Sequence, residues 1–489
     1  MQTHRRPNRG ALVAWLLAVP IAGYAQPDGD LFDDSILHEI RLIIHPSDWL
    51  SLRANPQDNK YYQAAFSWRG ITLEDIGVRS RGSGSRNGPK PGLRLDFNRF
   101  EKQELLGHEQ LILKPNVQDA SQLHEPLSMV FFRRMGLAAP REAHARLYVN
   151  DEYVGLYSIV EGVDKRFLRR NFGEDAGYLY EFRPRDDYRF EYLGPDPTLY
   201  SPSLFKPVTH EKDPNPAPLE AMIRTIHLAS EAEFAAAMPS FLDLKLYVTH
   251  LAADNFIGEV GGISGTNNFY FYRFQGKLLS QFITWDKDGT WEYELETFWK
   301  NGKENVLARR ALENGDLRRA YLETQLRAAA LMGGAGGWLD QEVLRRYNLI
   351  REAALEDPNK HCLRPDGGLK SCTNEEFEDA FVRLRSFIAG HGDYIRGAVA
   401  AAGYQPAPDA PELYEALTVD ETASAIIVYG RNLEGASFYV NGFLVEPSQV
   451  TPGQAEIPMS AEAGAGRIPV TAIINGVPSN TVMVRRFDR

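Results

Sequence analysis

A proline-rich stretch at residues 405–411, Gln-Pro-Ala-Pro-Asp-Ala-Pro, separates two parts of the chain with different hydrophobic patterns. Proline lacks an amide hydrogen and its ring clashes with the preceding helical turn, so this stretch ends any helix that reaches it. Short β-prone runs with two Asn-Gly turns follow the stretch, which predicts a linker at 405–411 and a small immunoglobulin-like β-sandwich at 412–489. Apolar residues recur at helical spacing before it, at about 217–256, 304–332, 338–356 and 374–402.

The part before the linker also contains β-prone segments, so we expect an α+β fold there. Asp119 is a candidate N-cap for a helix that would run from this residue to Met135 and stop at Gly136. The predicted strands are 36–44, 64–68 and 71–78, and the predicted hairpins are 146–160 and 268–285.

The first 25 residues have the order of features found in export signals. Three arginines form a positive front, residues 11–23 form a short apolar core, and the small residues Gly23 and Ala25 mark a cleavage site. The core is shorter than the ~20 residues that span a bilayer, and Pro20 interrupts it. We therefore expect cleavage after Ala25 and a secreted, periplasmic or cell-surface protein whose mature chain has no transmembrane segment.

The charge of the chain argues against a nucleic-acid partner. Lys and Arg number 54 against 65 Asp and Glu, which gives a formal net charge of −11. An acidic chain lacks the long-range attraction to phosphate backbones on which nucleic-acid binding depends. The hydrophobic content of 43% and the charged content of 24% are typical of a globular protein.

The chain contains two cysteines, Cys362 and Cys372, and neither has a neighbouring pair of histidines that would suggest a zinc site. They flank a loop-like Pro-Asp-Gly-Gly sequence. Because export leads to an oxidising compartment, we expect a structural disulfide between them.

Residues 78–97 combine glycines, hydroxyls and positive charges between two predicted strands. Flexible backbone N–H groups beside fixed cations are what a polyphosphate requires, although solvated turns of this composition are also common. The candidate residues are Gly82 and Gly84 for the backbone groups, and Arg79, Arg81, Arg86 and Lys90 for the cations.

Two further segments carry candidate acids. A predicted strand ends in Trp-Asp-Lys-Asp-Gly, so Asp286 and Asp288 lie two positions apart and could share a hard cation such as Mg²⁺. Earlier in the chain, Asp254 at a helix end precedes a glycine-rich loop that leads to Asn268. This order is similar to a phosphotransfer loop, although each of these residues is also common at ordinary turns.

Taken in order, these segments resemble the spore coat protein H (CotH) kinase family over residues 33–400. The resemblance depends on four groups of residues: Gly77-Val-Arg-Ser-Arg-Gly82 with Lys90 and Leu93-Arg-Leu-Asp-Phe97; Gly155-Leu-Tyr-Ser-Ile-Val-Glu-Gly-Val-Asp164; Asn268-Phe-Tyr-Phe-Tyr272; and Ile283-Thr-Trp-Asp-Lys-Asp288. It implies an atypical protein-kinase-like fold that binds ATP with Mg²⁺, or with Mn²⁺ or Ca²⁺ as alternatives. It also implies transfer of a phosphoryl group to Ser or Thr of an exported protein.

The resemblance also implies roles for individual residues. Asp254 matches the catalytic acid, Asp286 the metal ligand with Asp288 in support, and Asn268 a further metal ligand for which Asn267 is the alternative. Lys90 is the candidate for the lysine that grips the phosphates, with Arg94 as its competitor, and Glu161 is the carboxylate that orients it. Arg79 and Arg81 are expected to face the phosphates together with Gly82 and Gly84.

Two other functions remain open from the sequence. The chain could be a non-catalytic surface or matrix protein that contacts a surface or a polysaccharide through its C-terminal β-domain. It could also transfer another group, such as AMP or an amino acid, to protein.

Overall fold

The structure is a computed structural model that describes residues 31–486, with the exception of 83, 85, 87, 186–187, 260, 293–298, 300–301, 365–367, 419–423 and 460–465. The predicted export signal lies outside the described residues. Among the described residues, no helix is both long and apolar enough to cross a bilayer. The chain contains both helices and strands, partly in separate groups such as α7 to α9 (306–356) and β14 to β22 (412–486), which confirms the predicted α+β class.

The N-terminal strands form a closed barrel in the order β1-β2-β3-β4-β5-β7-β6. Side chains alternate between the two faces of a strand, so Val78, Leu95 and Leu113 fill the barrel while Arg79 and Lys114 lie on its outer face. The barrel therefore turns a charged outer surface toward the rest of the molecule. Its elements are β1 (His38–Ile44), α1 (Pro46–Ala54), β2 (Tyr62–Trp68), β3 (Ile71–Ser80), β4 (Leu93–Asp96), β5 (Gln110–Lys114), β6 (Glu142–Val149) and β7 (Glu152–Val160).

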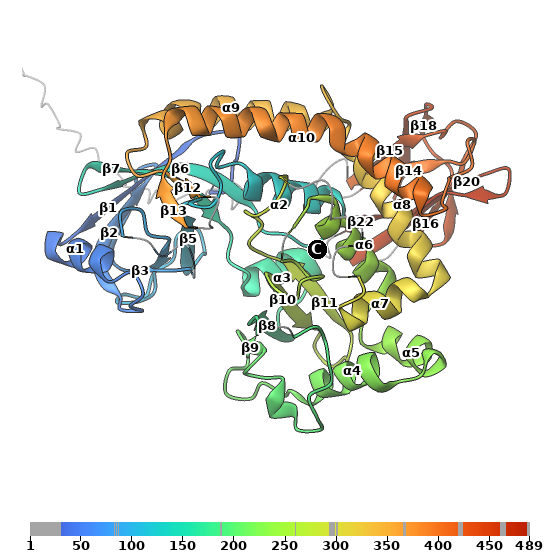
Figure 1. The fold of residues 1–489 in the computed structure, drawn as a ribbon, viewed down its shortest axis with the longest axis horizontal. Coiled ribbons are helices and arrows are strands. Elements are labelled where there is room, and N and C mark those ends of the chain that lie inside the picture. Colours follow the sequence, from blue (N-terminus) through green and yellow to red (C-terminus); the bar gives the residue numbers. More distant parts are fainter. Residues whose placement is uncertain are drawn as a thin grey trace, which may run out of the picture.

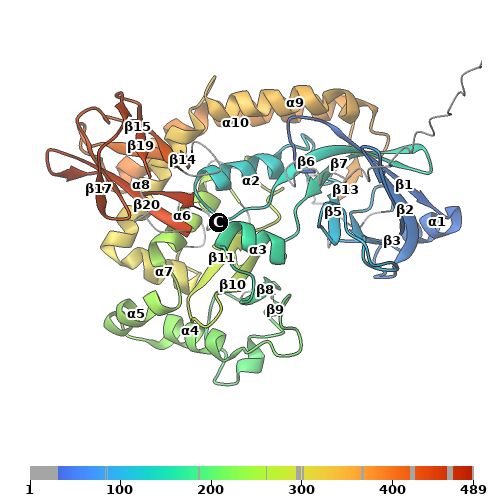
Figure 2. The same ribbon diagram turned by 180° about the vertical axis from the view of Figure 1, so that it is seen from behind.

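A second, four-stranded sheet has the order β11-β10-β8-β9 and packs with the helices around the largest apolar cluster. Figures 1 and 2 show this sheet between the barrel and the helices α4 to α7, while α9 and α10 run along one side of the molecule. The strands are β8 (Tyr178–Phe182), β9 (Phe205–Pro207), β10 (Phe269–Arg273) and β11 (Ser280–Thr284). The helices are α2 (His124–Arg134), α3 (Lys165–Phe172), α4 (Ala217–Leu228), α5 (Glu231–Ala237), α6 (Leu244–Phe256), α7 (Val306–Glu313), α8 (Gly315–Met332), α9 (Trp338–Glu356) and α10 (Asn374–Ala401), with short 3₁₀ turns at Pro197–Leu199 and Met238–Ser240.

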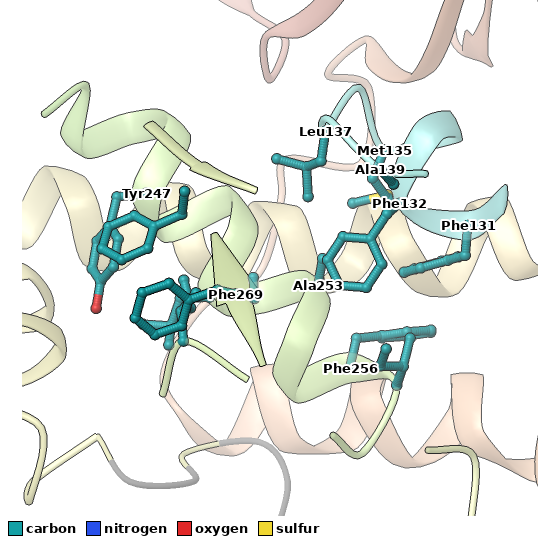
Figure 3. Packing of buried hydrophobic residues seen from close by; sticks show 14 of the residues in the cluster. Phe131, Phe132, Met135, Leu137, Ala139, Tyr247, Ala253, Phe256 and Phe269 are labelled. Carbon is teal, nitrogen blue, oxygen red and sulfur yellow. The ribbon is translucent and has the colours of Figure 1, made fainter. Parts of the chain in front are cut away.

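The helix α2 is shorter than its predicted range of 119–135. The carboxylate of Asp119 accepts hydrogen bonds from the backbone N–H groups of Ser121 and His124, so it folds the preceding turn and the helix begins at His124. The apolar face of α2 packs on α6, where the ring of Phe131 stacks on that of Phe256 at a centroid distance of 5.4 Å (Figure 3).

The C-terminal strands form two sheets that share one apolar cluster, including Leu413, Phe438 and Val470. Both predicted Asn-Gly turns are confirmed, because Asn441-Gly442 and Asn475-Gly476 have the positive φ angles that a two-residue hairpin turn requires. One sheet contains β14 (Glu412–Thr418), β15 (Ala425–Arg431), β19 (Gln454–Pro458) and β18 (Gln449–Val450), and the other contains β17 (Phe443–Val445), β16 (Ser437–Val440), β20 (Gly466–Ile474), β21 (Val477–Pro478) and β22 (Val482–Arg486).

The strands β12 (His361–Leu363) and β13 (Leu369–Ser371) form a small hairpin. Cys362 lies on β12, and Cys372 directly follows β13. The structure holds both as buried free thiols and not as the predicted disulfide. Their sulfur atoms and a carboxylate oxygen of Glu376 nevertheless lie within 4.8 Å of one another. The pairing of the two strands therefore brings the thiols together without a covalent bond.

Candidate active site

A cavity of about 1840 Å³ lies between the outer face of the barrel strands β3 to β5, the helix α3 and the sheet that contains β10. The predicted residues that line it are Arg79, Arg81, Gly82, Gly84, Asn268, Asp286 and Asp288, together with the alternatives Arg94 and Asn267. A second cavity of about 760 Å³, between α5, α6, α7 and α8, contains none of the predicted site residues. The large cavity is therefore the candidate active site.

Lys114, at the end of β5, joins two acids beside this cavity. Its Nζ lies 2.5 Å from both carboxylate oxygens of Glu125 on α2 and also donates to Asp286. Burial alone would lower the pKa of Lys114, but the charges of Asp286 and Glu125 outweigh burial and raise the pKa above its ordinary value. Lys114 therefore stays protonated, and it lies between the buried Glu125 and Asp286, which lines the cavity.

Asp286 is the member of this group that reaches the cavity, with 40% of its side chain exposed. Burial would raise the pKa of Asp286, but Lys114 holds it below its ordinary value, so the carboxylate is ionised at neutral pH. Glu125, by contrast, is 1% exposed. The contacts of Lys114 with Glu125 and with Asp286 therefore connect the helix α2 to the segment that follows β11.

Neither Lys114 nor Glu125 was among the predicted site residues. The signal that could have identified them is a lysine that ends an apolar strand, Gln-Leu-Ile-Leu-Lys, directly after the glycine-rich hairpin. An acid in the first turn of the next helix completes this signal. Lys–Glu pairs between a strand and a helix are a recurring part of kinase sites.

The structure contradicts the predicted role of Lys90. Its side chain is completely buried, and Nζ lies 2.7 Å from Oδ2 of Asp357, which also accepts a hydrogen bond from the backbone N–H of Leu156. Lys90 is not among the residues that line the cavity. Lys90 therefore joins the barrel to the end of α9 and lies away from the residues that line the cavity.

The predicted role of Glu161 is also wrong, because it does not orient either lysine. Its carboxylate accepts hydrogen bonds from the guanidinium groups of Arg141 and Arg170 and from the backbone N–H of Arg141. These two charges lower the pKa of Glu161 although burial would raise it. Glu161 thereby attaches α3 to the end of the barrel, directly before the cavity residues Gly162 and Val163.

Asp254, the predicted catalytic acid, lies behind the cavity wall. It is completely buried, its Oδ2 accepts from the backbone N–H of Ile263 at 2.8 Å, and its Oδ1 lies 3.4 Å from Nζ of Lys287. Gly262 passes so close that a Cβ atom there would lie 2.5 Å from Oδ2 of Asp254. The loop therefore covers Asp254, and the structure does not bring it together with Asp286 in the cavity.

Lys287 also approaches Glu259, whose Oε2 lies 3.7 Å from its Nζ. Burial raises the pKa of Glu259 to about 7, although the charge of Lys287 opposes this shift. Lys287 thus lies inside the protein with two acids, while its sequence neighbours Asp286 and Asp288 line the cavity.

Asn268 fixes the backbone that carries Asp286. Its Nδ2 donates to the carbonyl oxygen of Asp286 at 3.0 Å, and both residues have left-handed φ angles, of 54° and 56°. Asn and Asp tolerate this conformation better than most residues. Burial, and then the charge of Asp286, raise the pKa of Asp288 well above its ordinary value. The cavity wall therefore presents two carboxylates that repel each other unless a cation lies between them.

Arginines line the barrel side of the cavity. The guanidinium of Arg81 lies 5.1 Å from the ring centre of Trp285, and Oδ1 of Asn59 accepts hydrogen bonds from both Arg79 and Arg86. Burial, and then the charges of Arg79 and Arg81, lower the pKa of Arg86. In the described part of the chain, none of these arginines forms an ion pair with a carboxylate. The barrel side therefore suits an anion.

A strand lysine paired with a helix glutamate, next to an aspartate that lines the cavity, is a combination that also occurs in kinase sites. The chain belongs to the CotH kinase family, because the family model described as "CotH kinase protein" matches residues 78–394. The chain is also similar to the inner spore coat protein H of Bacillus subtilis (strain 168). The two are 25% identical over 334 residues, which is 65% of this chain and 88% of that relative. The predicted family is thus confirmed.

Proposed function

We propose that this chain is an exported protein kinase that transfers the γ-phosphoryl group of ATP to Ser or Thr of an exported or surface protein. The observation that supports this most strongly is the contact of Lys114 with both the buried Glu125 and Asp286, which lines the cavity. In this proposal the barrel and the helical part form an atypical kinase-like body, and the two C-terminal sheets form an immunoglobulin-like sandwich.

The barrel side of the cavity would hold the phosphates. Lys114 would donate to a phosphate oxygen, and Glu125 would keep its ammonium group in place. Arg79 and Arg81 would add positive charge, and the backbone N–H groups around Gly82 and Gly84 would add hydrogen-bond donors.

The metal ligands would be the carboxylates of Asp286 and Asp288 and the amide oxygen of Asn268, which are oxygen atoms of the type that Mg²⁺ prefers, with Mn²⁺ or Ca²⁺ as alternatives. The two neighbouring carboxylates at this wall fit a divalent cation, because such a cation would add to the positive charges of Lys114, Arg81 and Lys287 that already oppose their repulsion. A bound cation would neutralise charge on the phosphates. Lys114 would then share Asp286 with the metal.

Asp254 would act as a positioning residue in this proposal. Its carboxylate holds the loop through the N–H of Ile263 and contacts Lys287, which donates to the carbonyl oxygen of Asn268 at 3.3 Å. Phosphoryl transfer depends more on positioning and charge than on a strong base, so the reaction does not require Asp254 in the cavity.

The direct test is calorimetric titration of the purified chain with ATP in the presence and absence of Mg²⁺, followed by mass spectrometry of a co-exported protein. We expect Mg²⁺-dependent ATP binding and a gain of one phosphoryl group on Ser or Thr. No binding at millimolar ATP would favour the non-catalytic surface protein. Binding with a different mass gain would favour transfer of AMP or another group.

A further inference from the structure

The last turn of α2 is held by a strand that lies 281 positions later in the chain. Nε of Arg134 donates to the two carboxylate oxygens of Glu415 on β14, at 2.9 and 3.1 Å. Glu415 is 1% exposed, and the guanidinium of Arg134 also lies 4.1 Å from the ring centre of Trp338. A buried carboxylate with a paired guanidinium fixes geometry as well as charge.

A second arginine supports the same contact from α8. Nε of Arg327 donates to the carbonyl oxygen of Tyr414 at 2.6 Å. Its two terminal nitrogens donate to the carbonyl oxygens of Arg134 and Met135 at 3.3 and 3.4 Å. The last carbonyl groups of a helix have no partner within the helix, and a cation is favourable at that end. Arg327 therefore joins β14 to the C-terminal end of α2.

Glu125, which pairs with Lys114, lies in the first turn of α2, at the opposite end of the helix from Arg134. Eleven residues separate the ends of the helix by about 16 Å, and backbone hydrogen bonds join its successive turns. Its start is held by the carboxylate of Asp119, which accepts from the backbone N–H of His124, and by Nε1 of Trp291, which donates to Oγ of Ser128. The orientation of Glu125 therefore depends on the contacts at both ends of α2, including the one with Glu415 at the far end.

We propose that Glu415 is a positioning residue for the phosphate site, acting through Arg134 and the helix α2 on Glu125 and Lys114. This inference rests on the proposed function for its catalytic consequence. It also means that the C-terminal strands are part of the catalytic body, although a proline-rich stretch precedes them. A truncation near Tyr404 would expose the end of α2 and remove its anchor.

The first experiment needs no nucleotide. Hydrogen exchange of the backbone amides of α2 is compared in the full-length chain, in Glu415→Gln and in the matched control Glu412→Gln. Glu412 lies on the same strand and pairs instead with Arg431 on β15, at 2.6 Å. We expect at least tenfold faster exchange in α2 for Glu415→Gln and no change for the control. Unchanged exchange in both variants would overturn the inference.

The second experiment is a double-mutant cycle with Glu125→Gln, measured as the Kd of ATP with Mg²⁺. We expect Glu415→Gln to weaken ATP binding at least fivefold in the wild-type background and less than twofold in the Glu125→Gln background. Equal losses in both backgrounds would show that Glu415 does not act through Glu125. The charge reversal Arg134→Glu with Glu415→Arg should restore more than half of the loss, and further loss would count against the inference.

The two experiments separate this inference from the proposed function. If the wild-type chain binds no ATP, the proposed function fails, while the exchange experiment still tests whether Glu415 holds α2. If ATP binds but exchange in α2 does not respond to Glu415→Gln, the inference fails and the proposed function stands.

Discussion

Replacement of Lys90 and Lys114 by methionine, one at a time, distinguishes a structural lysine from one that binds phosphate. Both side chains pair with buried acids, so both variants lose stability. Loss of one partner of a buried ion pair costs about 3–5 kcal/mol. For Lys90→Met, the second replacement Asp357→Asn removes the unpaired charge and should recover most of this loss.

The expected effects on ATP binding differ. A hydrogen bond between charged groups contributes about 1.5–3 kcal/mol, which corresponds to about 10- to 150-fold in Kd. We therefore expect Lys114→Met to weaken binding of ATP by this factor, because the ammonium group contacts Asp286, which lines the cavity. Lys90 is completely buried against Asp357, so the double variant Lys90→Met/Asp357→Asn should bind ATP within about twofold of the wild type.

The assay is calorimetric titration with ATP and Mg²⁺ on the folded fraction, with thermal unfolding measured on the same samples. Lys90→Met/Asp357→Asn is the control for Lys114→Met, because each variant loses a buried lysine. Equal loss of ATP affinity in the two proteins would refute the assignment of Lys114, and it would return the phosphate-binding role to Lys90.

Three further predictions concern the metal, the thiols and the pH. Asp286→Ala should abolish the Mg²⁺ dependence of ATP binding, whereas Glu109→Ala, at another cavity acid, should keep it; calorimetry with and without Mg²⁺ decides this. Mild oxidation should join Cys362 and Cys372, so labelling of the denatured, unreduced chain should fall from two thiols to none, and two labelled thiols after oxidation would contradict it. Burial lowers the pKa of His391 to about 4, below its ordinary value of 6.5. The unfolded chain therefore takes up this proton first as the pH falls, and the stability that neutral His391 contributes is lost between pH 6.5 and 4. Urea unfolding should show a loss of about 2 kcal/mol from this group between pH 7 and 5, and His391→Gln should reduce it.

Local signals in the sequence predicted much of the fold. The alternating burial of side chains in β1 depends only on neighbouring residues, and so do the Asn-Gly turns at 441–442 and 475–476. The structure contains the strand and both turns as expected. The glycine-rich loop and the Trp-Asp-Lys-Asp segment also reach the cavity as predicted, because each directly follows a strand whose end faces it.

The misassigned residues depend on partners that are distant in the sequence. Lys90 pairs with Asp357, 267 positions later, and no local pattern announces that contact. Glu161 directly follows the strand β7, a position at which acids of binding sites are common. Its arginine partners, however, lie 20 positions before it and 9 positions after it in the sequence. Lys114 was not predicted, because Lys90 lies within the glycine-rich segment 78–97 and Lys114 lies outside it. The proline-rich linker ends α10 as predicted, yet it does not separate the C-terminal strands from α2.

The long separation between Arg134 and Glu415 has a consequence for the order in which the protein matures. Contacts between residues so far apart form late, because a long loop must close before they contribute to stability. A chain that emerges from its N-terminus can build the barrel early, since the strands β1 to β7 all lie within the first 160 residues. The anchor of α2 becomes available only once β14 has followed. A phosphate site that depends on this anchor would stay incomplete during synthesis and reach its working geometry only after β14 has followed.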